Sequence, residues 1–128
     1  MTPFLRTSSD GTEHWLNWVV RLPNGELAGY VQATVQMDGV AYIAYELASR
    51  FWRQSIGSDA VSALLRELKL EYNVHTFLAV LKSRNYRSLA LLKSLRFHCG
   101  LPENISDVGL EPDELVVHKQ EGAGASAA

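Results

Sequence analysis

The spacing of apolar residues divides this chain into two halves. In the first half, runs dense in β-branched and aromatic residues are separated by short turn signals, as is typical of strands. The runs cover residues 14–22, 27–36 and 40–47, and the turns are Pro23-Asn24-Gly25-Glu26 and Asp38-Gly39. Because both turns are short, these strands are predicted to form an antiparallel meander.

In the second half, strand-like runs alternate with apolar residues at helical spacing. A helix is predicted from about residue 60, a strand over 76–81, a second helix that ends at Arg96-Phe97, and a last strand over 113–118. The apolar faces of the two helices are Ala60, Val61, Leu64, Leu65 and Leu68, and Leu89, Leu92 and Leu95. The fold class predicted is α/β (α+β), with a mixed sheet in which an antiparallel meander precedes strand, helix, strand and helix.

The segment that joins the third strand to the first helix has the features of an anion site. It reads FWRQSIGSDA over residues 51–60. Free backbone N–H groups and the positive end of the helix dipole meet at such a junction, Gly57 permits close approach, and Arg53 adds a positive charge. A phosphate or pyrophosphate would fit. The alternative is an ordinary structural junction, since small residues are common at such turns.

A second junction of the same kind follows the strand over 76–81. Asn85 is placed to cap the next helix, with Ser88 three residues on. Two successive junctions at the carboxyl ends of strands are where an α/β sheet tends to bind its ligand. The alternative to a ligand-binding role is structural: Asn85 would only cap the helix, and Ser88 would bond only to backbone.

Together the two junctions resemble a known family. The chain is similar to the GNAT N-acetyltransferases, in particular to the ribosomal-protein N-terminal acetyltransferase-like branch, over residues 15–118. The resemblance lies in the order of its parts: a strand, the turn W-x-x-x-I-G-x-D-A, a helix, a second strand, and then the helix motif N-x-x-S-x-x-L-L-x-x-L-x-F. The departures are Ser55 and Arg96, where the family usually has glycine, and Leu92, where many members have a tyrosine that acts as general acid. The usual N-terminal strand and two helices are also expected to be missing, so the chain looks N-terminally truncated.

The resemblance implies an acyltransferase that moves an acetyl group from acetyl-CoA to a primary amine, a protein N-terminus or a small molecule, by direct transfer. The coenzyme residues that it implies are Leu47, Ala48, Arg53, Gln54, Ser55, Ile56, Gly57, Ser58, Asn85 and Ser88. Glu46 is the candidate base and Ser88 the candidate acid. Glu46 could instead pair with Arg50 or Arg53. The rival functions are a non-catalytic acyl-CoA or CoA-binding module and a truncated, inactive homologue.

The composition mainly excludes other classes of function. The net charge of −2 gives no electrostatic case for nucleic acid, and no apolar run approaches the length of a membrane helix. The four histidines show no metal-ligand spacing, so no metal is expected. Cys99 is the only cysteine, which fits a cytoplasmic protein, and it is expected to be a small apolar filler near a strand.

Three segments are predicted along the chain: a flexible lead-in over 1–13, a GNAT-like acetyltransferase domain over 14–120, and a disordered tail over 121–128. Without the N-terminal helices, apolar surface around Trp15, Trp18 and the 27–36 strand would be uncovered. A homodimer that buries this surface is therefore expected. The alternative is that the lead-in folds back, which the apolar Phe4 and Leu5 permit.

Overall fold

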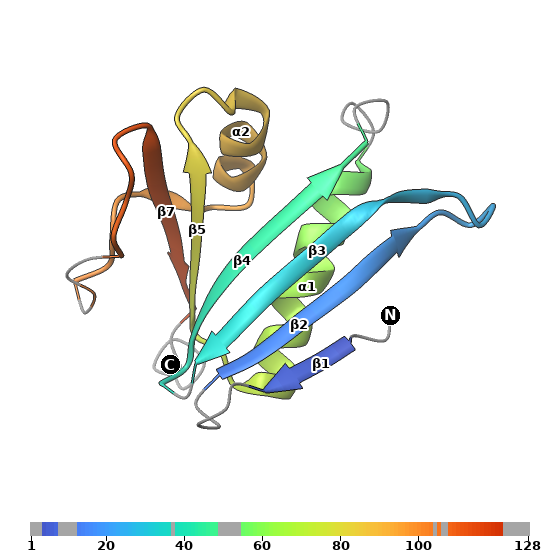
Figure 1. Cartoon of the computed structure of the whole chain (residues 1–128), viewed down its shortest axis with the longest axis horizontal. Coiled ribbons are helices and arrows are strands. Elements are labelled where there is room, and N and C mark those ends of the chain that lie inside the picture. The colour runs from blue at the N-terminus through green and yellow to red at the C-terminus, as the bar shows by residue number, and fades with distance from the viewer. Residues whose placement is uncertain are drawn as a thin grey trace.

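One seven-stranded mixed sheet organises the chain, in the strand order β1-β2-β3-β4-β5-β7-β6 (Figure 1). The computed structural model describes residues 4–7, 13–36, 38–48, 55–103, 105 and 108–121. The strands are β1 (Phe4–Thr7), β2 (Glu13–Arg21), β3 (Leu27–Gln36), β4 (Val40–Leu47), β5 (Thr76–Lys82), β6 (His98–Cys99) and β7 (Glu114–Gln120), and the helices are α1 (Ile56–Tyr72) and α2 (Tyr86–Ser94). The predicted fold class is confirmed.

The meander β2–β3–β4 forms as the apolar pattern predicts, with β3 and β4 at the predicted bounds. Its first turn is closed by two backbone hydrogen bonds, from Leu22 N to Glu26 O at 2.9 Å and from Gly25 N to Leu22 O at 2.8 Å. Gly25 has a φ of 86°, a conformation that glycine adopts without strain. The turn chemistry therefore sets the register of the hairpin.

The first residues differ from the prediction. In place of an entirely flexible lead-in over 1–13, residues 4–7 form β1, which pairs antiparallel with β2 from Phe4–Asn17 to Thr7–His14. Residues 4–7 thus fold back onto the edge of the sheet. A strand of four residues carries too little alternation to be recognised in sequence, and the hydrogen bonds to β2 define it.

A single large apolar cluster fills one side of the sheet. Its largest members include Trp18 from β2, Phe77 from β5, Leu64 and Leu68 from α1, and Leu92 from α2. Both helices therefore pack on the same core. Trp18, expected on an uncovered surface, is instead only 1% exposed.

The opposite face is covered only in part. A smaller cluster of Val40, Leu78 and Val116 is closed over by side chains of the segment before β7, namely Leu101, Ile105 and Val108. Over β2 and β3, four large apolar side chains stay exposed: Trp15, Val19, Leu27 and Tyr30.

A β-bulge interrupts the pairing of β2 with β3. Val20 pairs with Gly29, whereas the next residue, Arg21, pairs with Leu27, so Ala28 is the extra residue. Gly29 is required here, because a Cβ at this position would overlap the carbonyl oxygen of Glu46 on β4. The bulge changes which side chains of β3 share a face.

Candidate active site

The parallel strands β4 and β5 diverge towards their carboxyl ends (Figure 1). Their pairing stops after three residue pairs, Val40–Thr76, Ala41–Phe77 and Tyr42–Leu78, although both strands continue. A cavity of about 300 Å³ opens where they separate. It is lined by Ile43, Ala44, Tyr45, Ala79, Val80, Leu81, Lys82, Asn85, Ser88, Leu92 and Glu114. We call it the β4–β5 cleft.

A hydroxyl pair spans the β4–β5 cleft. Ser88 Oγ on α2 donates to the Tyr45 hydroxyl on β4 at 2.7 Å, and the Tyr45 hydroxyl donates to the Ser88 carbonyl oxygen at 3.3 Å. Burial raises the pKa of Tyr45 to about 12, while the hydrogen bond from Ser88 acts to lower it. Two protonated hydroxyl groups therefore lie in the lining of the cleft.

Asn85 caps α2 as predicted. Its Oδ1 accepts a hydrogen bond from the backbone N–H of Ser88 at 3.2 Å, which satisfies one of the free donors of the first turn. Asn85 also lines the β4–β5 cleft. Capping occupies the carbonyl oxygen of the amide, so the amide N–H groups remain the donors that a ligand could use.

The N-terminus of α1 lies beside the end of β4. Ser55 is the N-cap residue but makes no side-chain cap, and its hydroxyl instead donates to Asp59 Oδ2 at 3.5 Å. The N–H groups of the first turn, Ile56, Gly57 and Ser58, are those that a helix leaves without an intrahelical partner. Arg53 and Gln54 are outside the described residues.

Gly57 has a packing role. A Cβ on this residue would come within 2.8 Å of Leu47 Cδ1 and 3.2 Å of Leu91 Cδ1. The absent side chain lets α1 approach both β4 and α2 closely. Space for this packing is what the structure shows; the approach of a ligand to Gly57 stays a prediction.

Glu46 points away from the β4–β5 cleft. Successive side chains of a strand alternate, and Glu46 is exposed on the face opposite Tyr45. Its Oε2 accepts a hydrogen bond from the Tyr30 hydroxyl at 2.9 Å, which is the first cause of a raised pKa at Tyr30. The predicted partners Arg50 and Arg53 are outside the described residues.

Glu46 lines a second, more open cavity of about 440 Å³. Leu47 and Ala48, predicted to contact the coenzyme, line this cavity too, whereas Ile43, Ala44 and Tyr45 represent β4 in the cleft itself. Contact of Leu47 and Ala48 with the coenzyme stays a prediction.

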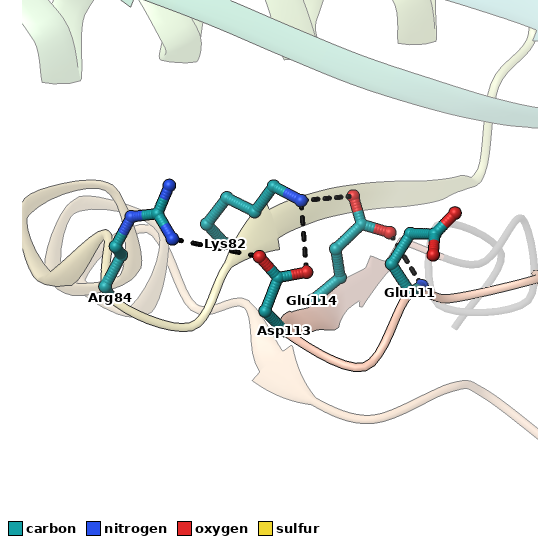
Figure 2. Close-up of polar contacts among 5 residues, drawn as sticks. All are labelled: Lys82, Arg84, Glu111, Asp113 and Glu114. Carbon is teal, nitrogen blue, oxygen red and sulfur yellow. Dashed lines mark hydrogen bonds and ion pairs between the residues drawn. The ribbon is translucent and has the colours of Figure 1, made fainter.

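The carboxyl end of β5 is held to β7 by a group of charged side chains (Figure 2). Lys82 Nζ lies 3.1 Å from Asp113 Oδ1 and 3.8 Å from Glu114 Oε2, and Arg84 lies 3.8 Å from Asp113 Oδ2. The hydrogen bond from Lys82 lowers the pKa of Asp113. Because these side chains are partly exposed, the pairs position the strand ends more than they stabilise the fold.

The sequence of the chain matches the profile of the acetyltransferase (GNAT) domain over residues 2–98. This match covers well over half of the chain. The chain belongs to the GNAT acetyltransferase family.

Solved structures of GNAT proteins and other acyltransferases share its fold. A Klebsiella pneumoniae protein assigned as an acyl-CoA N-acyltransferase has a TM-score of 0.74 at 15% identity, over 83% of this chain and 72% of that one. A variant of the spermidine N-acetyltransferase of Vibrio cholerae has a TM-score of 0.67 at 16% identity, over 88% and 68% of the two chains. The ribosomal-protein-S5-alanine acetyltransferase of Vibrio fischeri has a TM-score of 0.68 at 20% identity, over 87% and 63%.

The chain thus spans under two thirds of the Vibrio fischeri enzyme and somewhat more of the other two. At these identities the likeness concerns the fold. No curated protein matches the sequence.

Two departures of this GNAT chain have visible consequences. Leu92, where many members have a tyrosine, is 1% exposed and contributes only apolar surface to the cleft. Arg96, where glycine is usual, has a φ of 72° in the left-handed region. The residue after a helix C-cap commonly adopts this conformation, which explains the glycine elsewhere in the family.

Sequence reasoning missed Tyr45 as a site residue of this GNAT chain. The strand pattern treats it as one aromatic residue among several, and its importance comes from contact with a serine 43 positions away. Cys99 also differs from the prediction, because it is exposed on β6 and fills no apolar space.

Two negative findings concern only the described part of this GNAT chain. No group of three or more potential metal-binding His, Cys, Asp or Glu side chains occurs there. Neither α1 nor α2 is long and apolar enough to cross a membrane.

Proposed function

We propose that this chain binds acetyl-CoA in the β4–β5 cleft and transfers the acetyl group directly to a primary amine. The observation that carries the proposal is the cleft itself. In a GNAT-family chain, a cavity opens between two parallel strands beyond the point where their pairing stops, beside the N-terminus of α2. Such an edge offers backbone hydrogen bonds to an extended ligand, and the N-terminus of α1, which follows β4 in the chain, would offer the anion site.

The coenzyme would be held in two places. Its pyrophosphate would accept hydrogen bonds from the N–H groups of residues 55–58, with Arg53 and Gln54 as further donors. Its pantetheine arm would lie against the β4 edge beyond Tyr42, where the pairing with β5 ends. The Asn85 amide would donate to it from the other side of the cleft.

The hydroxyl pair would serve the leaving group. The amine nitrogen attacks the thioester carbonyl carbon, the carbon–sulfur bond breaks, and the sulfur leaves as a thiolate that must take up a proton. A backbone N–H at the β4 edge would stabilise the oxyanion. Ser88, hydrogen-bonded to Tyr45, would supply the proton, a role that Leu92 cannot fill.

The amine must lose a proton before it attacks. An α-amino group, with a pKa of about 7.7–8.0, is partly neutral in a cell, whereas a lysine near 10.4 costs about 3–4 kcal/mol more to deprotonate. An N-terminal or similarly acidic amine therefore demands less of the site. Glu46 is the proposed base; because its side chain lies on the face of β4 opposite Tyr45, it would act on an amine that approaches from that face, directly or through water.

A non-catalytic CoA-binding module is the second candidate. The observation that favours it is Leu92, which leaves the cleft with an apolar side chain at the position of the usual acid. Such a module would bind CoA and never consume acetyl-CoA. The proposed location in either case is the cytosol, where the lone Cys99 would stay reduced.

Calorimetry on the purified chain tests the proposal. We expect acetyl-CoA to bind with micromolar affinity, a free energy on the order of 8 kcal/mol. Asn85→Asp keeps the cap acceptor but replaces the amide donor with a charge, so it should weaken binding by about tenfold or more with little change in Tm. Asn24→Asp, a change of the same charge in the exposed β2–β3 turn, is the control. Unchanged affinity in Asn85→Asp would reduce that residue to a helix cap, and no binding by the parent chain would refute the proposal.

Turnover separates the two candidates. With a panel of amines, consumption of acetyl-CoA supports the transferase, and binding without consumption supports the module. In an active enzyme, Glu46→Gln should lower kcat by roughly 10²–10⁴-fold and leave coenzyme affinity intact, the range expected for loss of a general base. A full rate with an unaltered pH profile would remove Glu46 from the mechanism.

A further inference from the structure

The cavity around Glu46 has a chemistry of its own. We call it the β3–β4 pocket, defined by Val19, Leu27, Ala28, Gly29, Tyr30, Glu46, Leu47 and Ala48. At about 440 Å³ it is within the usual size range of small-molecule sites. It shares β4 with the β4–β5 cleft, in which Ala44 and Tyr45 lie directly before Glu46.

The wall of the β3–β4 pocket is apolar apart from one carboxylate. Val19, Tyr30 and Glu46 form a row across β2, β3 and β4, since Val19 pairs with Tyr30 and Tyr30 with Glu46. The other described lining side chains are aliphatic or absent, so Glu46 is the one charged group among the described residues of this wall.

The β-bulge completes the apolar wall. In an unbroken strand, Leu27 and Tyr30 would point to opposite faces, because they are three positions apart. The extra residue, Ala28, turns Leu27 to the face that carries Tyr30, and both side chains line the pocket. Bulges often redirect side chains next to active sites in this way.

The carboxylate of Glu46 is held in place. The Tyr30 hydroxyl donates to its Oε2 at 2.9 Å, which leaves the other oxygen and the remaining lone pairs for a ligand. A cation such as an ammonium would satisfy them. The apolar side chains around it favour carbon atoms over a second charge, because a charge there would lose water without gaining a partner.

We propose that the β3–β4 pocket is the acceptor site and takes a small primary amine with a single apolar substituent, alkyl or aryl. Its ammonium group binds Glu46 and its substituent packs on Val19, Leu27 and the ring of Tyr30, since the Leu47 side chain points to the other face of β4, towards α1. The inference rests on the proposed function, whose acceptor it specifies. It disfavours polyamines, since the described wall has only one carboxylate.

A matched pair of amines tests the proposal. Pentylamine and putrescine have the same number of heavy atoms, but putrescine ends in a second ammonium where pentylamine ends in a methyl group. We expect kcat/KM for pentylamine, and for phenethylamine, to exceed that for putrescine by at least about tenfold. Equal use of pentylamine and putrescine would overturn the substrate class and leave the transferase activity standing.

Two variants locate the effect. Leu27→Ser should reduce the preference for pentylamine by several-fold, whereas Leu70→Ser, at a residue on α1 that is 67% exposed, should not. An unchanged preference in Leu27→Ser would overturn the assignment of the pocket. If CoA binds but no amine is acetylated, calorimetry on the CoA complex measures the binding of pentylamine. No pentylamine binding would overturn the inference. Pentylamine binding that is lost in Leu27→Ser would support it. Failure of CoA itself to bind would refute the proposed function instead.

Discussion

The contact between Tyr45 and Ser88 joins a strand to a helix across the β4–β5 cleft. It is made by two side chains that no local pattern connects, one on a strand and one in the first turn of a helix. Buried hydroxyl groups keep their protons when they are hydrogen-bonded and desolvated. The Tyr45 hydroxyl therefore keeps its proton at neutral pH while it accepts a hydrogen bond from Ser88.

Unfolding at high pH should report on Tyr45. Its pKa is raised by burial from 10.0 to about 12, so in that range the unfolded chain loses a proton that the folded chain retains. Stability from this group is full below pH 10 and is lost as pH rises towards 12, at up to about 1.4 kcal/mol per pH unit. Urea unfolding should show a weaker decline for Tyr45→Phe. Tyr86→Phe, at a side chain that is 75% exposed, should keep the parent slope. Equal slopes in the parent and Tyr45→Phe would contradict the burial argument.

Asn85 and Ser88 could be predicted because capping is a local property. The cap needs a side-chain acceptor three residues before a free backbone N–H, and this spacing can be read directly from the sequence. Gly57 was also found, but its packing against Leu47 and Leu91 depends on two other elements. Tyr45 could not be found, since its partner is set by how β4 diverges from β5.

At the scale of elements, the end of α2 combines a regular motif with an unusual residue. Phe97 N donates to Leu92 O at 3.0 Å and Arg96 N to Lys93 O at 2.9 Å, the two bonds of a Schellman motif. Arg96 occupies its left-handed position, where a Cβ is unfavourable. The hydrogen bonds keep it there at a cost of about 1 kcal/mol.

Arg96→Gly should therefore stabilise the protein. The expected gain is about 0.5–1 kcal/mol in the free energy of unfolding, measured by urea titration. Arg96→Ala removes the same charge and keeps the Cβ, so it should bring little gain. If the alanine variant were as stable as the glycine variant, the charge and not the backbone would be the cause.

At Gly29, in the β-bulge, we expect the opposite effect: adding a side chain should destabilise the protein. Gly29→Ala would push a Cβ into the carbonyl oxygen of Glu46, so the strands must separate, at a cost of about 2–3 kcal/mol or more. Gly25→Ala is the matched control, because its φ of 86° is also positive but no atom lies within 4 Å of the added Cβ. It should cost only about 1 kcal/mol. Similar losses in thermal unfolding for both variants would show that the close approach to β4 is tolerated.

Elements with turn signals and alternation at both ends were predicted best. β3 and β4 begin and end where the apolar pattern and the Asp38-Gly39 turn place them. α1 begins at Ile56, earlier than the apolar spacing indicates, because its first turn is defined by hydrogen bonding and not by a buried face. β1 and β6 are short edge strands that exist through their neighbours.

At the scale of the whole molecule, the incompletely covered face of the sheet is the dominant feature. Trp15, Val19, Leu27 and Tyr30 are all exposed there, and β1 is an edge strand with one unpaired side. Exposed apolar surface of several hundred Å² is unusual for a monomer, and a free strand edge invites pairing. A homodimer that pairs β1 and covers the sheet around Trp15, leaving the β3–β4 pocket open, therefore remains our prediction.

Light scattering at micromolar concentration should give the mass of two chains. Trp15→Glu, at a side chain that is 39% exposed, should shift the mass towards one chain without loss of fold. Leu70→Glu adds the same charge on α1 and should leave the dimer intact. A monodisperse single chain with no tendency to aggregate would contradict the dimer and imply that β1 protects the edge sufficiently.

The short pairing between β4 and β5 should also affect the rate at which backbone amides exchange with solvent. Only three residue pairs join these strands, against nine for β2–β3 and seven for β5–β7. Beyond Tyr42 no residue pair joins β4 to β5 in the described part of the chain, so the β4 amides on that side should exchange with deuterium faster in the free protein than those bonded to β3. A ligand that adds its own hydrogen bonds to this edge would close the gap. Saturating CoA should therefore slow the exchange of these β4 amides and leave the exchange of the β2–β3 amides unchanged. If CoA did not change the exchange rate of the β4 amides, the coenzyme would not bind at this strand edge.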